Sequence, residues 1–467
     1  MLIIKRPFFV RNDLRHPYSR AALCCLGLLL PLTATLGGFS VSAQQLGVTW
    51  QAAPSEQQID SLSLEQAILR AFARNPQIAQ AAAQIRIGAS ELKLAESAWM
   101  PQLALNGGVG RQNQSDMPGT RGRTTSAGVS LTQLIYDFGK TGGSIDEQHH
   151  LSDAYRYQLY SIMTSVGQQT LLAYLQVKRY QTLSASAERH ITSLDAVKAI
   201  AQMRAEAGLN SQSDVLQAET RIAGTIATLE QYRAQQRSAL AQLTVLTGVV
   251  PVRLPDLPQA LLQQEITLQA LPYEQSALVR SAQSRQEAAR QRIRQAEAKH
   301  WPSISVQAAR ARNDTRNRAY WDDQVQLLVE APLYQGGAVS AQIDAAQNAR
   351  EAAQAEVEAA KLDINQRAAT SYADMIGAQQ RQAASERQFT SANYTRDVYR
   401  DEYRLSKRSL NDLLSVEQDV LQAENARATA QFDGWDATVN YAAAVDNLLD
   451  MLGIERQQAS GDRLPSL

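Results

Sequence analysis

Two stretches of the chain alternate apolar residues with small or polar ones, at the period of two that is typical of β-strands. Val129 and Leu131 lie in the first stretch, and Val325 and Leu327 lie in the second. The pattern predicts two β-hairpins, with strands at about 102–112, 124–136, 303–313 and 322–334. Each strand is roughly 10–13 residues long, close to the ~9–11 residues of a strand that crosses a membrane.

Apolar residues three or four positions apart predict helices before and after each hairpin. Residues 62–98 form two of them, because Asn75-Pro76 interrupts the periodic run. The stretch from Lys140 to about Glu206 contains no proline, and as one helix it would be roughly 100 Å long. Such a helix cannot bury itself in a compact domain, so it must pack beside other long helices.

Each long helix is expected to end in a short reversal. Gly208-Leu209-Asn210-Ser211 combines a glycine suited to the left-handed end of a helix with residues suited to cap the next one. The return helix then runs to about Thr247-Gly248. A second long stretch, from about Ala338 to Arg404, reverses near Leu405-Ser406-Lys407 and returns to Leu452-Gly453.

The same order of elements therefore occurs twice, about 200 residues apart, which indicates an internal duplication. Asp214-Val215-Leu216 and Glu219 return as Asp412-Leu413-Leu414 and Glu417. The expected organisation is a signal peptide at 1–43, an N-terminal extension at 44–61, a first repeat at 62–248, a Pro-rich linker at 249–271, a second repeat at 272–453 and an irregular tail at 454–467.

The N-terminus has the features of a cleaved export signal: basic residues, an apolar segment and the small-residue site Val41-Ser42-Ala43. Both cysteines, Cys24 and Cys25, lie inside this segment and precede its apolar core, so we expect neither a disulfide nor a lipid-attachment cysteine. Removing five Lys/Arg and one Asp from a neutral chain leaves a net charge of −4. A mildly acidic protein is a poor candidate for binding nucleic acid.

No catalytic, cofactor or metal site is expected. Gly139-Lys140-Thr141 resembles part of a phosphate-binding loop, but Leu134 stands where that loop needs a glycine. His149 and His150 are adjacent on a helix and should point in different directions, which favours solvated helix surface over a metal site. The chain has no nucleophile elbow and no glycine-rich dinucleotide loop, so an enzyme is the least favoured class.

The duplication, the junctions Tyr136-Asp137-Phe138-Gly139 and Tyr334-Gln335-Gly336-Gly337, and the two reversals together resemble the TolC family of bacterial outer-membrane ducts. The resemblance covers residues 62–453. It implies a homotrimer in the outer membrane of a Gram-negative bacterium, with a 12-stranded β-barrel joined to a periplasmic barrel of α-helices. It also implies docking to a periplasmic adaptor and, through it, to an inner-membrane pump.

Elementary constraints agree with a trimer, because four strands are too few to close a membrane barrel and open strand edges are not tolerated in lipid. Aromatic residues lie where the interfaces with outer-membrane lipid would place them. Trp99, Tyr136, Trp301 and Tyr334 lie at the helix-side ends of the strands, and Tyr320 and Trp321 lie near the opposite end. Ordinary packing at a domain junction is the alternative explanation.

The family closes its duct at the periplasmic end with side chains near the two reversals. The matching positions here are Asp214 in the first repeat and Tyr403, Arg408 and Asp412 in the second. The resemblance implies that Asp214 accepts hydrogen bonds from Arg408 and Tyr403, within or between protomers, and that Asp412 forms an acidic ring in the lumen. Ser415 stands where the family often has a second acid. The alternative for Asp214 and Asp412 is a role in capping their helices.

These features predict a passive exit duct of a tripartite export system. One version serves type I protein secretion beside an ABC transporter, and the other serves multidrug or small-molecule efflux beside a proton-driven pump. The absence of a lipid-attachment cysteine favours secretion, since many family members dedicated to drug efflux are lipidated. A structural coiled-coil surface protein is a remote alternative, which should lack the paired hairpins and the internal repeat.

Overall fold

The computed structural model describes residues 57–112, 122–209, 211–257, 273–315 and 318–454. The predicted signal peptide, most of the N-terminal extension and nearly all of the C-terminal tail lie outside the described residues. Within them, the structure confirms a mainly helical fold with two antiparallel β-hairpins.

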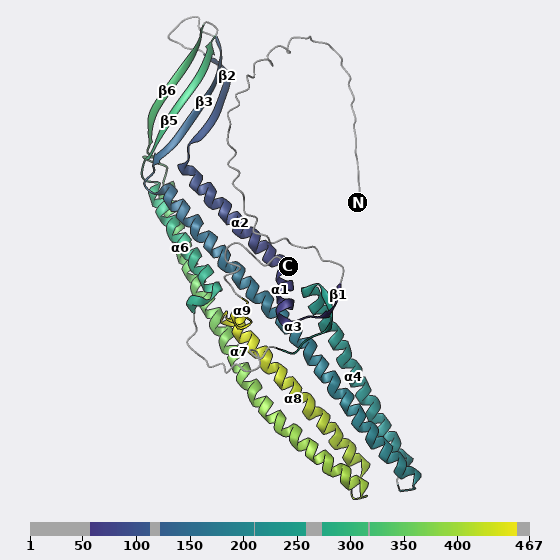
Figure 1. The fold of residues 1–467 in the computed structure, drawn as a ribbon. Helices are drawn as coiled ribbons and strands as arrows, with labels where there is room; N and C mark the ends of the chain where they lie inside the picture. Colours follow the sequence, from purple (N-terminus) through teal and green to yellow (C-terminus); the bar gives the residue numbers. More distant parts are fainter. Residues whose placement is uncertain (1–56, 113–121, 210, 258–272, 316–317, 455–467) are drawn as a thin grey trace, which may run out of the picture. The chain divides into compact units, whose positions relative to one another are not determined.

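The two hairpins form one antiparallel sheet in the order β2-β3-β5-β6 (Figure 1). Its strands are β2 (Gln102–Gln112), β3 (Gly122–Tyr136), β5 (Ser303–Thr315) and β6 (Arg318–Glu330). The repeats meet where β3 pairs with β5, with Leu131 opposite Ala308. Among the described residues, β2 pairs with β3 alone and β6 with β5 alone. Within the described residues, the outer edges of β2 and β6 thus have no strand partner.

The register gives this sheet two chemically different faces, because successive side chains of a strand point to opposite sides. On one face Leu105 lies opposite Val129, and Ala308 lies opposite Val325. Three of these apolar side chains are exposed: Leu105 at 82%, Val325 at 79% and Val129 at 44%. The other face is hydrogen-bonded and mostly uncharged: Asn106 donates to Ser130 (2.9 Å), Gln326 to Gln307 (2.8 Å) and Gln324 to Gln326 (2.8 Å).

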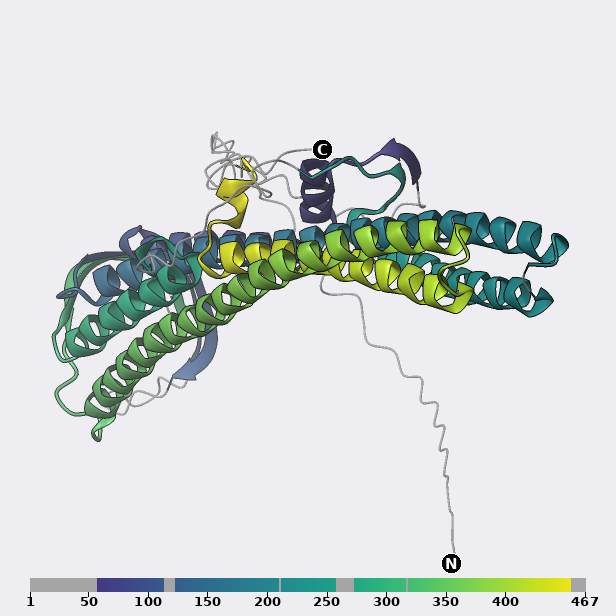
Figure 2. The same cartoon turned by 90° about the horizontal axis from the view of Figure 1, so that it is seen from below.

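Two long helical hairpins follow the strands: α3 (Lys140–Glu206) with α4 (Gln212–Thr247), and α7 (Ala338–Arg404) with α8 (Leu410–Ala444). Figure 2 shows α4 beside α3 and α8 beside α7. Helices α3 and α7 begin at residues 140 and 338 and are both 67 residues long, so equivalent positions lie 198 residues apart. The structure thus repeats the duplication seen in the sequence.

Helices α3 and α7 each start after a glycine in the left-handed conformation, Gly139 (φ 98°) and Gly337 (φ 83°) respectively. A side chain at either position would strain the backbone. In the first repeat the buried Asp137 also accepts hydrogen bonds from the backbone amides of Thr141 (2.7 Å) and Gly139 (3.3 Å). This carboxylate satisfies amides that the first turn of a helix leaves unpaired.

Shorter helical elements complete the described part of the fold. They are α1 (Leu64–Arg74), α2 (Pro76–Glu96), η1 (Ser97–Trp99), η2 (Tyr273–Gln275), α6 (Ala277–Ala298) and α9 (Leu448–Met451). Ser63 caps α1 in a capping box with Gln66, and Asn75 caps α2 directly before Pro76. The largest apolar core lies where α1 packs against α3 and α4. It includes Leu62, Ile68, Leu171, Tyr174 and Leu243, all of which are 0% exposed.

The elements of the structure differ from the expected boundaries at three places. The segment assigned to the linker begins with a strand, β4 (Val249–Arg253), which pairs in parallel with β1 (Gln57–Ser61) of the assigned N-terminal extension. Strand β6 starts earlier than expected, at Arg318, and also ends earlier, at Glu330. The earlier end is consistent with Pro332, which lacks the amide hydrogen that a strand needs. Helix α8 ends at Ala444, where Asp446 adopts a positive φ of 59° before α9.

Candidate functional site at the helix reversals

The ends of the two helical hairpins are joined by a small apolar cluster to which all four long helices contribute. Its fully buried members are Leu194, Val197 and Ala201 of α3, Val215 and Ala218 of α4, Tyr403 of α7, and Leu410, Leu413 and Leu414 of α8. Apolar burial is non-directional. Polar side chains around the cluster therefore determine how the hairpins are aligned.

Arg204, near the end of α3, makes polar contacts between the two reversals. Its Nη1 donates to the backbone carbonyls of Tyr403 (3.0 Å) and Arg404 (3.2 Å), and its Nη2 donates to the Ser406 hydroxyl (2.7 Å). The guanidinium also lies 5.0 Å from the centre of the Tyr403 ring. One side chain of the first hairpin thus caps the last turn of α7 in the second.

Two of the predicted gate residues lie close together here. Tyr403 is 1% exposed in the last turn of α7, and Asp214 is in the first turn of α4. Burial raises the pKa of the Tyr403 hydroxyl, the charge of Arg204 lowers it, and the negative charge of Asp214 raises it further. The charge of Asp214 therefore acts on Tyr403, while the role of both residues in a gate stays a prediction.

The other two predicted gate residues have partners within their own hairpin. The Nε of Arg408 donates to Glu402 Oε2 (3.0 Å), and its guanidinium lies 4.1 Å from the centre of the Tyr399 ring. Asp412 forms a capping box with Ser409 at the start of α8. The capping role of Asp412 is thus visible, while the bonding of Arg408 to Asp214 and the acidic ring stay predictions about an assembly.

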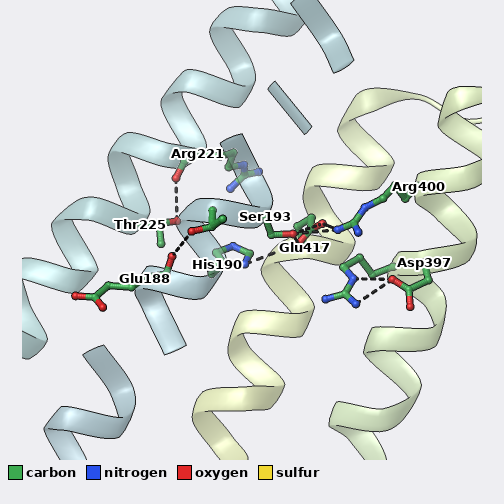
Figure 3. Close-up of polar contacts among 10 residues, drawn as sticks. Glu188, His190, Ser193, Arg221, Thr225, Asp397, Arg400 and Glu417 are labelled. Carbon is green, nitrogen blue, oxygen red and sulfur yellow. Dashed lines mark hydrogen bonds and ion pairs between the residues drawn. The ribbon is translucent and has the colours of Figure 1, made fainter. Parts of the chain in front are cut away.

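Above the apolar cluster, Glu417 of α8 is fully buried and connects three helices (Figure 3). Arg400 of α7 donates to its Oε1 (2.8 Å), and the Ser193 hydroxyl of α3 lies 3.0 Å from both carboxylate oxygens. Arg400 also donates to Ser193 (3.0 Å). A buried carboxylate is tolerated only when paired and hydrogen-bonded, so this network holds the second hairpin against α3.

His190, one turn before Ser193, is a fourth member of this network, with its Nδ1 3.8 Å from Glu417 Oε2. Burial lowers the pKa of His190, while Glu417 and Glu424 raise it and Arg396 lowers it. The net lowering favours the neutral imidazole in the folded chain. The stabilisation that follows is complete above the ordinary histidine pKa and is lost as the pH falls through the lowered one.

The repeat makes the burial of Glu417 distinctive. Its equivalent in the first repeat, Glu219, pairs with Lys198 (2.8 Å) on the surface of the α3–α4 hairpin, and its side chain is 45% exposed. The two acids occupy the same position in the repeat, but only Glu417 faces a third helix. The sequence shows their equivalence and gives no indication of this difference in burial.

Polar contacts continue along α3 and α8 toward the sheet, and we call this set the inter-hairpin seam. It comprises Arg189 with Glu424 (2.5 Å), Arg179 with Asp433 (2.9 Å) and Asp436 (2.8 Å), Gln168 with Asn440 (2.8 Å), and Thr164 with Asp446 (2.7 Å). Burial raises the pKa of Asp436 to about 6, against the lowering effect of Arg179. The inter-hairpin seam therefore combines ion pairs with hydrogen bonds between uncharged or partly buried side chains.

The predicted interface aromatics fall into two groups. At the helix side of the sheet, the Phe138 ring contacts Tyr136 (4.7 Å between centroids) and stacks on Trp301 (5.5 Å), while the Trp99 carbonyl accepts a bond from Gln133 (2.7 Å). Tyr320 and Trp321 lie in β6. The guanidinium groups of Arg310 and Arg312, from the neighbouring strand β5, lie over the Trp321 ring. Tyr334 lies beyond β6 and is 87% exposed. Their placement at membrane interfaces stays a prediction.

Across the described ranges, no helix is both long and apolar enough to cross a membrane. The described residues thus form a tandem pair of long helical hairpins attached to a sheet with one largely apolar face and one polar face. The model of the family described as "Outer membrane efflux protein" matches residues 67–249 and 269–453. The chain belongs to this family.

Relatives and solved structures agree with this assignment. The chain is 24% identical over 422 residues to "Outer membrane efflux protein BepC" of Brucella suis (88% of this chain, 90% of that one) and 27% identical over 395 residues to "Protein CyaE" of Bordetella pertussis (80% and 82%). It is 25% identical over 418 residues to "Outer membrane protein TolC" of Escherichia coli (83% and 82%).

The outer-membrane channel OprN has the same fold, with a TM-score of 0.70 at 20% identity (82% of this chain, 90% of that one). So does the outer-membrane protein VceC of Vibrio cholerae, with a TM-score of 0.70 at 17% identity (82% and 96%). The protein is therefore an outer-membrane efflux channel of Gram-negative bacteria in the TolC family, whose members are transport ducts and not enzymes.

Proposed function

We propose that three copies of this chain form one channel, and that the channel is the exit duct of a type I protein secretion system with a periplasmic adaptor and an inner-membrane ABC transporter. The observation that carries the trimeric duct is the sheet of four strands, with unpaired outer edges and one exposed apolar face. Pairing β6 of one chain with β2 of the next would satisfy both edges. The apolar face then meets lipid and the amide-lined face meets water.

The helix reversals would form the periplasmic gate of this duct. Separating α7–α8 from α3 would break the contacts of Arg204 and Glu417, so these residues favour the closed state. Asp214, Tyr403, Arg408 and Asp412 are the proposed gate residues, with Arg408 and Tyr403 bonding to Asp214 and with Asp412 lining the lumen. Arg408 would have to exchange its bond to Glu402 for one to Asp214 when the trimer assembles or the gate closes.

Support for secretion comes from the positions of the two cysteines. Both lie in the predicted leader before its apolar core, where neither suits lipid attachment, and lipidation is the feature expected of many efflux members. The second candidate is small-molecule efflux beside a proton-driven pump. It is favoured by the name of the BepC relative, which describes an efflux protein.

Deleting the gene in its native host tests this proposal. We expect a large protein to disappear from the culture medium while susceptibility to antibiotics and detergents changes little. Increased susceptibility with an unchanged set of secreted proteins would favour the efflux duct instead. If the deletion changes neither the secreted proteins nor the susceptibility, and supplying extra copies of the gene on a plasmid also changes neither, the proposed export function is wrong.

A further inference from the structure

The first turns of α3 carry a group of side chains that the duct does not use. His149, His150 and Asp153 each present one ligand atom, and these three atoms lie within 4.8 Å of one another. We propose that they bind one divalent transition-metal ion of the zinc, nickel and copper class. The site is independent of the reversals and of the gate.

Helix geometry explains how adjacent histidines converge. At about 100° per residue, Asp153 lies one turn beyond the histidines, about 40° around the axis from His149 and about 60° from His150. The carboxylate therefore sits between the two imidazoles in projection. Adjacency alone suggests divergent side chains, but the acid on the next turn gives both histidines a common neighbour.

The distances suit a metal ion with little rearrangement. His149 Nδ1 lies 3.5 Å from Asp153 Oδ2, and two ligands of a tetrahedral zinc ion are about 3.3 Å apart when each bond is ~2.05 Å. The imidazoles of His149 and His150 are nearly perpendicular, with centroids 5.8 Å apart. A modest rotation of His150 would complete three protein ligands and leave further positions for water.

The surroundings set the ligand class and the limits on affinity. Two imidazoles and one carboxylate suit zinc, nickel and copper better than calcium or magnesium, which prefer all-oxygen sites. Arg156 Nη1 contacts the other oxygen of Asp153, Oδ1, at 3.3 Å. That contact orients the carboxylate and leaves Oδ2 toward His149, although the positive charge of Arg156 opposes a cation.

The second repeat shows that α3 does not need these imidazoles in order to fold. The positions 198 residues later are Gln347, Asn348 and Glu351, in the same region of α7. The acid recurs one turn beyond a pair of polar residues, but both histidines are replaced by amides. His149→Gln with His150→Asn is therefore a substitution that the same architecture already carries.

Calorimetric titration of the tag-free, detergent-solubilised trimer or monomer with ZnCl₂ tests the site. We expect one Zn²⁺ per chain, a loss of affinity of at least about tenfold in the His149→Gln/His150→Asn variant, and a comparable loss in Asp153→Asn. The exposed His300 provides the matched control, and His300→Ala should bind Zn²⁺ as the parent does.

Circular dichroism of each variant establishes that the helices are intact. The proposal is overturned if the parent binds no Zn²⁺ below about 1 mM, or if the His149→Gln/His150→Asn variant keeps the parental affinity and stoichiometry. It is also overturned if His300→Ala removes the binding. Because His149 is 62% exposed, the fold should tolerate these changes.

Discussion

Replacing Arg400 by methionine is expected to destabilise the helical hairpins by about 3 kcal/mol, because it leaves the carboxylate of Glu417 buried without its cationic partner. Glu417 is 0% exposed and would keep only the Ser193 hydroxyl and the more distant His190. Thermal unfolding followed by circular dichroism in detergent measures the effect. Methionine keeps most of the apolar volume of the arginine stem, so the lost charge dominates.

Arg396 supplies a matched control, since it lies one turn earlier on α7 and pairs with its exposed neighbour Asp397. Arg396→Met should change stability by no more than about 0.5 kcal/mol. Adding Glu417→Gln to Arg400→Met should recover a large part of the loss, because it removes the uncompensated charge. Equal effects of Arg400→Met and Arg396→Met would show that the Glu417 network does not hold the second hairpin against α3.

Replacing Arg204 by methionine is expected to shift the channel toward the open state by tenfold or more. The substitution removes three charge-assisted hydrogen bonds from the first hairpin to the end of α7. Such bonds contribute about 1.5–3 kcal/mol each where water is excluded and less at an exposed position. A shift of ~1.4 kcal/mol is enough for a tenfold change. Single-channel recording in planar bilayers measures the open probability.

Arg404 is the control for this experiment, because it lies at the same reversal and its side chain contacts Asp401 of its own helix (3.6 Å). Arg404→Met should gate like the parent channel. If Arg204→Met gates like the parent as well, the contact between the reversals does not keep the duct closed, and the gate must lie elsewhere along the helices.

The strong periodic signals in the sequence predicted the elements that depend on local chemistry. The long helices begin and end where Gly139, Gly208 and Gly337 permit left-handed backbone, and the strands follow the alternation of apolar residues. Of the boundaries that differ, the one at β4 depends on a partner distant in sequence. Strand β4 is five residues long, contains Pro251 and pairs with a segment almost 200 residues earlier, so it has no local pattern to detect.

The candidate site was predictable only in part, for a similar reason. The resemblance indicated the reversals, and with them Asp214, Tyr403, Arg408 and Asp412, because those positions can be aligned by motif. Arg204, Arg400 and His190 contact the other hairpin, and their roles depend on how α3 packs against α7 and α8. The duplication marks Glu219 and Glu417 as equivalent, yet packing makes one a surface residue and the other a buried anchor.

The central claim is that three copies of the mature chain form one membrane channel. The direct measurement is the native mass of the detergent-extracted protein, with planar-bilayer recording from the same fraction. We expect three chains that begin near Gln44, without lipid, and stepwise ion conductance. A stable monomer with no conductance would contradict the account.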